Sequence, residues 1–192
     1  MATKTDIANM ALALLGTNPV TDIGDDTPAG FQSRVFFHST VDRVVRNHPW
    51  KSTLKRVALT ATTTPVFGYD YAYILPADPY CLKVWEMQEP EYRFKVENRL
   101  LLTDETTAKI LYSFRPTIYG SLDPDLIAVI YYELAIQMCM ALTRDRNLKK
   151  ELIEDLTMRI EKDAKFNGAI EELQEEKSDE PSTWIQERNT VG

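Results

Sequence analysis

The sequence predicts an α+β fold, in which a four-helix bundle formed from both chain ends carries an inserted antiparallel β-domain. Apolar residues recur at helical spacing near both ends of the chain, whereas in the middle they alternate in short runs separated by turns. The connections between these runs are too short for the crossovers of a parallel sheet. We therefore expect a helical body from residues 1–51 and 117–177, a β-domain from residues 52–116, and an extended tail from residues 178–192.

Two helices are expected before the β-domain. The first covers residues 5–15, where Thr5 can cap the N-terminus and Gly16 supplies a stop. The second begins near Thr27 and ends before Pro49, because the residue before a proline avoids helical geometry. The predicted apolar faces consist of Ile7, Met10, Ala11, Leu14 and Leu15 in the first helix and Phe31, Val35, Val41, Val44 and Val45 in the second.

The middle of the chain is predicted to form short strands. Alternating patterns predict strands at residues 56–61, 69–73, 81–87, 92–96, 100–103 and 109–114. Tyr69, Tyr71 and Tyr73 occupy every second position, so they are expected on one face of their strand. Residues 97–99 are expected to form the turn between two strands.

Two longer helices are expected after the β-domain. The third covers residues 124–142, with Asp123 as its cap, and it is apolar almost all round, which is typical of a central buried helix. The fourth covers about residues 147–175, with Leu148, Leu152, Leu156 and Ile160 in a stripe at four-residue spacing. The chain then becomes acidic and loses its periodicity, which predicts an extended or disordered tail in the free monomer.

The composition limits the classes of function. The chain has 192 residues, a formal net charge of −7 and a pI near 5.0. An acidic balance argues against tight nucleic-acid binding, because affinity for DNA comes mainly from Lys and Arg. We expect no membrane span and no signal peptide, and therefore a protein made in a cytoplasm. The two cysteines, Cys81 and Cys139, are expected to be buried free thiols.

The sequence shows no catalytic, cofactor-binding or metal-binding pattern, so we expect a protein without cofactors that is not an enzyme. The only histidines, His38 and His48, are ten residues apart and are not expected to share a helical face. No Cys and His spacing resembles a zinc site, and no glycine-rich phosphate loop is present. Most carboxylates fall in the fourth helix and tail, where charged residues usually form a solvated face.

Two features suggest contacts with partners. The tyrosines Tyr69, Tyr71 and Tyr73 fit either a half-buried sheet face or a partner surface, since tyrosine is favoured at interfaces. The acidic tail contains an isolated apolar pair, Trp184 and Ile185, and an aromatic anchor can carry much of an interface. We expect the tail to dock on a neighbouring subunit through Trp184, although a tail without a partner fits the sequence equally well.

Several segments resemble one family in their order and spacing. These segments are Ile7-Ala8-Asn9-Met10-Ala11-Leu12-Ala13-Leu14-Leu15-Gly16, His48-Pro49-Trp50-Lys51 with Leu54-Lys55-Arg56, Phe67-Gly68-Tyr69-Asp70-Tyr71-Ala72-Tyr73-Ile74-Leu75-Pro76-Ala77-Asp78 with Cys81-Leu82-Lys83-Val84, and Glu97-Asn98-Arg99-Leu100-Leu101 with Thr103 and Leu111-Tyr112. Together they resemble the tail tubular protein A, or head-to-tail adaptor, family of short-tailed bacteriophages. The resemblance extends over nearly the whole chain, and no single segment is diagnostic alone.

The resemblance implies a structural protein of the virion, at the junction of head and tail. Such a protein forms a ring, usually of twelve copies, between the portal protein and the nozzle formed by tail tubular protein B. It also implies a central channel through which DNA passes without sequence-specific binding. The family has no catalytic residues to transfer to this chain. A repulsive acidic wall would suit a DNA conduit.

A tail component that binds or hydrolyses glycans is the alternative, based on the aromatic β-region. Hydrolysis would need paired carboxylates in a cleft. Asp70 and Asp78, near the tyrosines, are the only candidates that the sequence offers.

Overall fold

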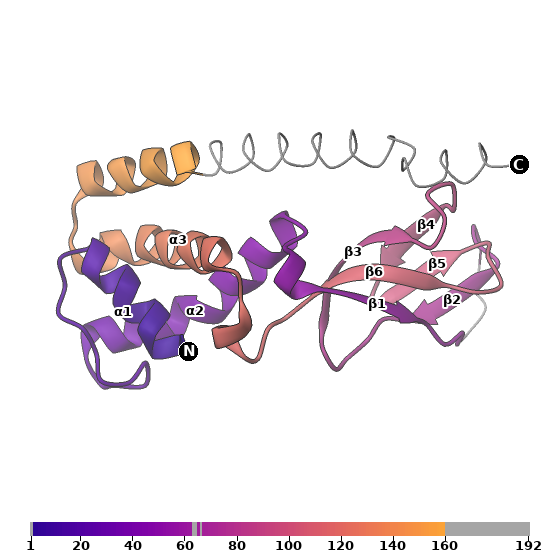
Figure 1. Ribbon diagram of the computed structural model, residues 1–192, viewed down its shortest axis with the longest axis horizontal. Helices are drawn as coiled ribbons and strands as arrows, with labels where there is room; N and C mark the ends of the chain where they lie inside the picture. Colours follow the sequence, from indigo (N-terminus) through magenta and orange to yellow (C-terminus); the bar gives the residue numbers. More distant parts are fainter. Residues whose placement is uncertain (1, 63–64, 66, 160–192) are drawn as a thin grey trace, which may run out of the picture. The chain divides into compact units, whose positions relative to one another are not determined.

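The computed structural model describes residues 2–62, 65 and 67–159 of the chain. The chain divides into two compact units, Met1–Lys149 and Lys150–Gly192. In its described residues the first unit contains the helices α1, α2 and α3 and two small antiparallel sheets (Figure 1). The α+β class is therefore confirmed. The four-helix bundle and a separate β-domain at residues 52–116 stay predictions.

Helix α1 (Lys4–Leu14) begins earlier than the sequence suggested. Its N-cap is Thr3, whose hydroxyl accepts a hydrogen bond from the Asp6 amide at 3.1 Å, while the Asp6 carboxylate accepts one from the Thr3 amide at 2.8 Å. This reciprocal pair satisfies two amides that would otherwise lack partners, so it favours Thr3 over the Thr5 we had expected. Gly16 follows the helix with a φ of 63°, in the left-handed region that glycine tolerates.

Helix α2 (Pro28–Asn47) has the predicted ends. The Thr27 hydroxyl accepts a hydrogen bond from the Gly30 amide at 3.1 Å. The expected apolar face is wrong in the first half of the helix, because Phe31 and Val35 remain 51% and 50% exposed. Small residues face inward there instead, and a Cβ at Gly30 would collide with the Asp25 backbone. In the second half, Val41, Val44 and Val45 are buried as expected, and Phe37 is buried as well.

Helix α3 (Pro124–Leu142) lies at the centre of the helical part and packs against both α1 and α2 (Figure 1). Its buried side chains include Leu126, Ile130 and Leu134, each fully buried. By length and composition alone α3 could cross a membrane, which the sequence had not led us to expect. Core helices of globular proteins pass the same test, and half of the apolar window of α3 is buried.

The described residues contain six strands, which form two three-stranded antiparallel sheets. One sheet has the order β1 (Leu54–Ala58), β6 (Lys109–Phe114), β3 (Cys81–Met87), and the other has the order β2 (Tyr71–Ile74), β5 (Leu100–Thr103), β4 (Phe94–Glu97). The short helices η1 (Lys51–Thr53) and η2 (Tyr119–Ser121) precede β1 and follow β6.

The two sheets share one apolar core. Tyr73 and Leu101 from the second sheet pack with side chains of the first sheet, such as Val84, Ile110 and Tyr112. Both sheets therefore bury one face and leave the other available to solvent or partners.

Residues 146–159 form a further helical stretch that crosses the boundary between the two units. Leu152 and Leu156 are buried, whereas Ile153 is 45% exposed. The predicted stripe at four-residue spacing is therefore present over the described residues. Ile160 and the predicted remainder of this helix lie outside them.

Candidate functional site

In the described residues, two segments connect the helices to the sheets: one runs from α2 to β1 and the other from β6 to α3. Hydrogen bonds join these two passages of the chain. The Ser52 amide donates to the Asp123 carboxylate at 3.2 Å, and the Asp123 amide donates to the Ser52 hydroxyl at 3.2 Å. Asp123 stands at the N-cap position of α3, but its side chain makes no capping bond. Its carboxylate instead holds the other passage in place. We call the region around these passages the junction.

A charged pair crosses the junction. The Arg115 guanidinium, just after β6, donates two hydrogen bonds to the Asp42 carboxylate on α2. This carboxylate raises the pKa of Arg115. Because both side chains are partly exposed, at 40% and 24%, the pair contributes orientation more than stability. The Arg115 amide also donates to the Tyr80 carbonyl at 2.9 Å, which ties the same segment to the start of β3.

Tyr80 forms the aromatic part of the junction. The guanidinium of Arg99 lies 4.0 Å from the Tyr80 ring centre and that of Arg115 lies 4.7 Å from it. Arg99 also donates hydrogen bonds to three backbone carbonyls, those of Leu75, Pro76 and Cys81. Arg99 lies in the turn between β4 and β5, and through these bonds it holds the loop between β2 and β3 in place.

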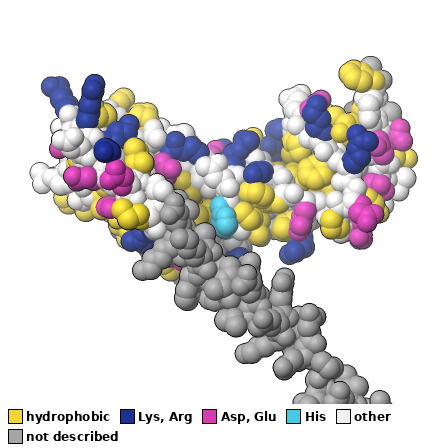
Figure 2. Space-filling view, turned by 90° about the horizontal axis from the view of Figure 1, so that it is seen from above, with side chains coloured by type: hydrophobic (Ala, Val, Ile, Leu, Met, Phe, Trp, Pro, Cys, Tyr) yellow, Lys and Arg dark blue, Asp and Glu magenta, His cyan; other side chains and the backbone are white. Residues whose placement is uncertain are grey.

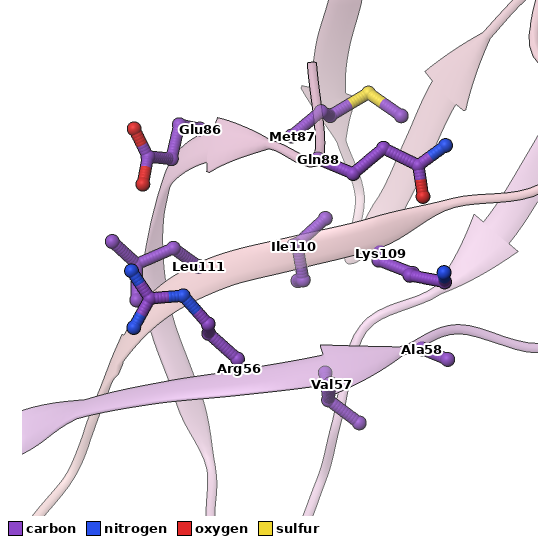
Figure 3. Close-up of a pocket in the computed structure, with 9 residues that line it drawn as sticks. All are labelled: Arg56, Val57, Ala58, Glu86, Met87, Gln88, Lys109, Ile110 and Leu111. Atoms are coloured by element: carbon purple, nitrogen blue, oxygen red, sulfur yellow. The ribbon is translucent and has the colours of Figure 1, made fainter. Parts of the chain in front are cut away.

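The outer face of the β1–β6–β3 sheet contains a shallow hollow of about 440 Å³ (Figure 3). Figure 3 shows Arg56, Leu111 and Glu86 in one row across the three strands, and Lys109 and Gln88 farther along the sheet. The hollow thus has an apolar centre with charged side chains at its margins.

A tryptophan lies on the same outer face, beyond the row of Arg56. The Trp85 indole donates a hydrogen bond to the Ser113 hydroxyl at 2.7 Å and shields that buried serine from solvent. The Lys83 ammonium lies 3.7 Å from the Trp85 ring centre, which is a favourable cation–π distance. This face therefore combines an aromatic ring with several cations, a set that suits a polar or anionic partner.

The tyrosines predicted at an interface have different environments. Tyr73 is 2% exposed and its hydroxyl donates to the Glu105 carbonyl at 2.8 Å, so it belongs to the core and is not available to a partner in this fold. Burial raises the pKa of its phenol. Tyr71 packs partly against the same core, and Tyr69 precedes the strand and is half-buried. An interface role for Tyr69 and Tyr71 stays a prediction, and Trp184 and Ile185 lie outside the described residues.

The two carboxylates considered for glycan hydrolysis are not brought together. Asp70 precedes β2 and Asp78 lies in the turn after it, so an extended strand of about 13 Å, at 3.3 Å per residue, lies between them in the chain. Glycosidase carboxylates lie about 5–9.5 Å apart. The structure therefore offers no support for this pair as a hydrolytic site.

The remaining reactive side chains are dispersed. Within the described ranges, no group of three or more His, Cys, Asp or Glu side chains could hold a metal ion. Cys81 and Cys139 are buried free thiols, as expected, and burial raises the pKa of Cys81 to about 11. Burial, followed by the Lys4 charge, lowers the pKa of His38 on α2.

Sequence reasoning missed both the junction and the hollow. Arg99 was interpreted only as a turn residue, and nothing in its local pattern indicates contacts with a loop more than 18 residues earlier. The charged residues Arg56, Glu86 and Lys109 did alternate with apolar neighbours, which placed them outside the core. The strand order that brings them together was not readable from these short strands.

No protein-family profile and no curated protein matches this chain.

Proposed function

We propose that this chain is a head-to-tail adaptor of the tail tubular protein A type, a structural protein of a short-tailed phage virion. In this proposal copies of the chain form a ring, of twelve in the assembled virion, between the portal protein and the tail tubular protein B nozzle. The ring walls part of the channel through which DNA leaves the capsid. Its fourth helix, which includes residues 146–159, joins α1, α2 and α3 in a four-helix ring body.

The proposal rests on the positions, in the structure, of the segments that resemble the adaptor family. The segment at His48–Trp50 ends α2, and the Trp50 indole donates to the Val44 carbonyl at 3.2 Å. Segments 75–78 and 97–101 meet through Arg99, whose guanidinium binds the Leu75 and Pro76 carbonyls. These segments, which resemble the family, therefore contribute to the junction and to the loop that Arg99 holds, and their roles there are structural. That is the pattern expected of a family selected for assembly and not for catalysis.

Negative-stain microscopy of the chain mixed with the portal ring of its own virion tests the proposal. We expect an additional ring layer on one end of the portal. An Arg115→Ala variant should join the portal less completely, because it loses the contact between α2 and the sheets. Lys95→Ala is the matched control, since Lys95 pairs with Glu97 on an exposed strand, away from the junction. Wild-type monomers that never join portal rings would contradict the proposal.

A further inference from the structure

The outer face of the β1–β6–β3 sheet is cationic in an acidic protein. Arg56, Lys83 and Lys109 lie on it with a single carboxylate, Glu86, among the residues of the hollow. Across the described part of the chain, none of these three cations forms an ion pair. The face thus carries three positive charges against one negative charge, although the whole chain has a net charge of −7.

The one carboxylate of the hollow does not neutralise its cations. Arg56 and Glu86 belong to the two edge strands, and Leu111 lies between them on β6. Neighbouring strands are about 4.8 Å apart, so the backbones of Arg56 and Glu86 are separated by about two such spacings, and within the described residues their side chains form no ion pair. An anionic chain could lie across Leu111 and bring its own carboxylates to the cations.

The negative charge of the protein is concentrated in another part of its sequence. Residues 150–192 contain 12 Asp and Glu against 6 Lys and Arg, whereas residues 1–149 contain 17 against 16. Accordingly, Figure 2 shows basic and acidic side chains interspersed on the face it presents. Residues 171–180 alone contain six carboxylates and one lysine. The chain therefore contains both a cationic face and a complementary anionic segment.

We propose that residues 171–180 of one copy bind the cationic outer sheet face of a second copy. This inference rests on the proposed ring, because a ring requires each copy to present two different, complementary surfaces. Arg56, Lys83 and Lys109 bind the carboxylates, and Leu111 and Trp85 contact the apolar parts of the segment. Exposed ion pairs are weak one by one, so the interaction depends on several pairs and weakens as salt screens them.

Charge reversal in full-length chains tests this contact by sedimentation velocity at low salt. The face variant is Arg56→Glu with Lys109→Glu, and the segment variant reverses four glutamates to lysine, at positions 171, 172, 175 and 176. We expect each variant to weaken self-association by about tenfold or more, and the combined variant to regain it. The control is Lys51→Glu with Lys95→Glu, which changes the charge equally outside the hollow and should leave self-association unchanged.

Mixing the two variants tests whether the segment of one copy binds the face of another. If the segment binds a second copy, the mixture associates, because each variant retains one intact partner surface. A mixture that stays monomeric would show that the segment does not bind the face of a second copy, and would overturn the proposal. Wild-type chains that stay monomeric at about 100 µM in about 50 mM salt, where the screening length exceeds 10 Å, would also overturn it.

Two further outcomes keep this inference distinct from the adaptor function. A face variant that forms portal-bound rings as stable as wild type would reject the contact and leave the adaptor function standing. Binding of duplex DNA that the face variant loses would assign the face to a nucleic acid, which also rejects the contact. Failure of the wild-type chain to join the portal contradicts the adaptor function, whatever the sedimentation result.

Discussion

Arg99 combines a strained backbone with an unusually well-bonded side chain. Its φ is 62° and that of Asn98 is 43°, so both residues of the turn between β4 and β5 are in the left-handed region. Two-residue hairpin turns favour this geometry, but arginine adopts it at a cost of about 1–2 kcal/mol. Hydrogen bonds to three carbonyls and the contact with Tyr80 offset that cost.

Substitutions at Arg99 should separate the two effects. We expect Arg99→Ala to lower the free energy of unfolding by about 2 kcal/mol, because the bonds are lost and the backbone strain remains. Arg99→Gly should cost about 1 kcal/mol less than that, since glycine accepts the turn geometry. Urea denaturation measures both, with Asn98→Gly as the control that changes only the turn. Equal losses for the two Arg99 variants would show that backbone strain does not matter here.

Ionisation of the Cys81 thiol makes the free energy of unfolding depend on pH in the alkaline range. Its pKa is about 9 in an unfolded chain and about 11 in the folded protein, because burial disfavours the thiolate. Below pH 9 the thiol is protonated in both states, whereas between pH 9 and 11 the unfolded chain alone loses the proton. Unfolding is therefore favoured as the pH rises through this window.

A Cys81→Ala variant should lose this dependence. Urea denaturation at pH 8, 9 and 10 should show the difference in unfolding free energy between wild type and variant shrinking as the pH rises. The window stops at pH 10 because the phenols of Tyr73 and Tyr112, whose pKa values burial also raises, contribute above it. A difference that stays constant with pH would contradict the assignment to Cys81.

At the scale of elements, the helical stretch at residues 146–159 offers a direct test of a predicted stripe. Leu152 and Leu156 are 4% and 5% exposed, and Ile153 between them is 45% exposed. Leu152→Ala and Leu156→Ala should each lower the free energy of unfolding by about 2–4 kcal/mol, and Ile153→Ala by about 0.5 kcal/mol or less. Urea denaturation of the three variants checks this order. Similar losses for all three would mean that this helix has no preferred face.

Elements were easier to predict from the sequence than their neighbours in space. Strand β3 matches its predicted range of 81–87, and α3 matches its range of 124–142, because local alternation and the Asp123-Pro124 start are strong signals. The face of α2 at Phe31 was wrong, because helical periodicity alone does not reveal that small residues there allow the Asp25 loop to approach.

The candidate sites were less predictable than the elements. Regular tyrosine spacing suggested a surface at Tyr73, yet the pairing of the two sheets buries that residue. The hollow at Arg56 and Lys109 depends on the strand order β1–β6–β3, which joins strands more than 50 residues apart. Long-range pairing of this kind leaves no local trace in a single sequence.

At the scale of the whole molecule, the distribution of charge fits assembly better than nucleic-acid recognition. The described sheets expose a small cationic face, and the acidic residues gather in the last quarter of the chain. Such separation promotes head-to-tail contacts between identical copies, which close into rings when the rotation between copies is right. The net charge of −7, repeated around a ring, would keep passing DNA from binding its wall.

Cryo-electron microscopy of the chain mixed with the portal ring of its virion tests the proposed adaptor function most directly. We expect a closed ring of this chain, twelve copies in the virion, stacked on the portal around an open central channel. The density of each copy should fit α1–α3 and the two sheets as they are described above. Portal rings that carry no density for the chain, or that carry single copies without ring closure, would contradict the proposed adaptor function.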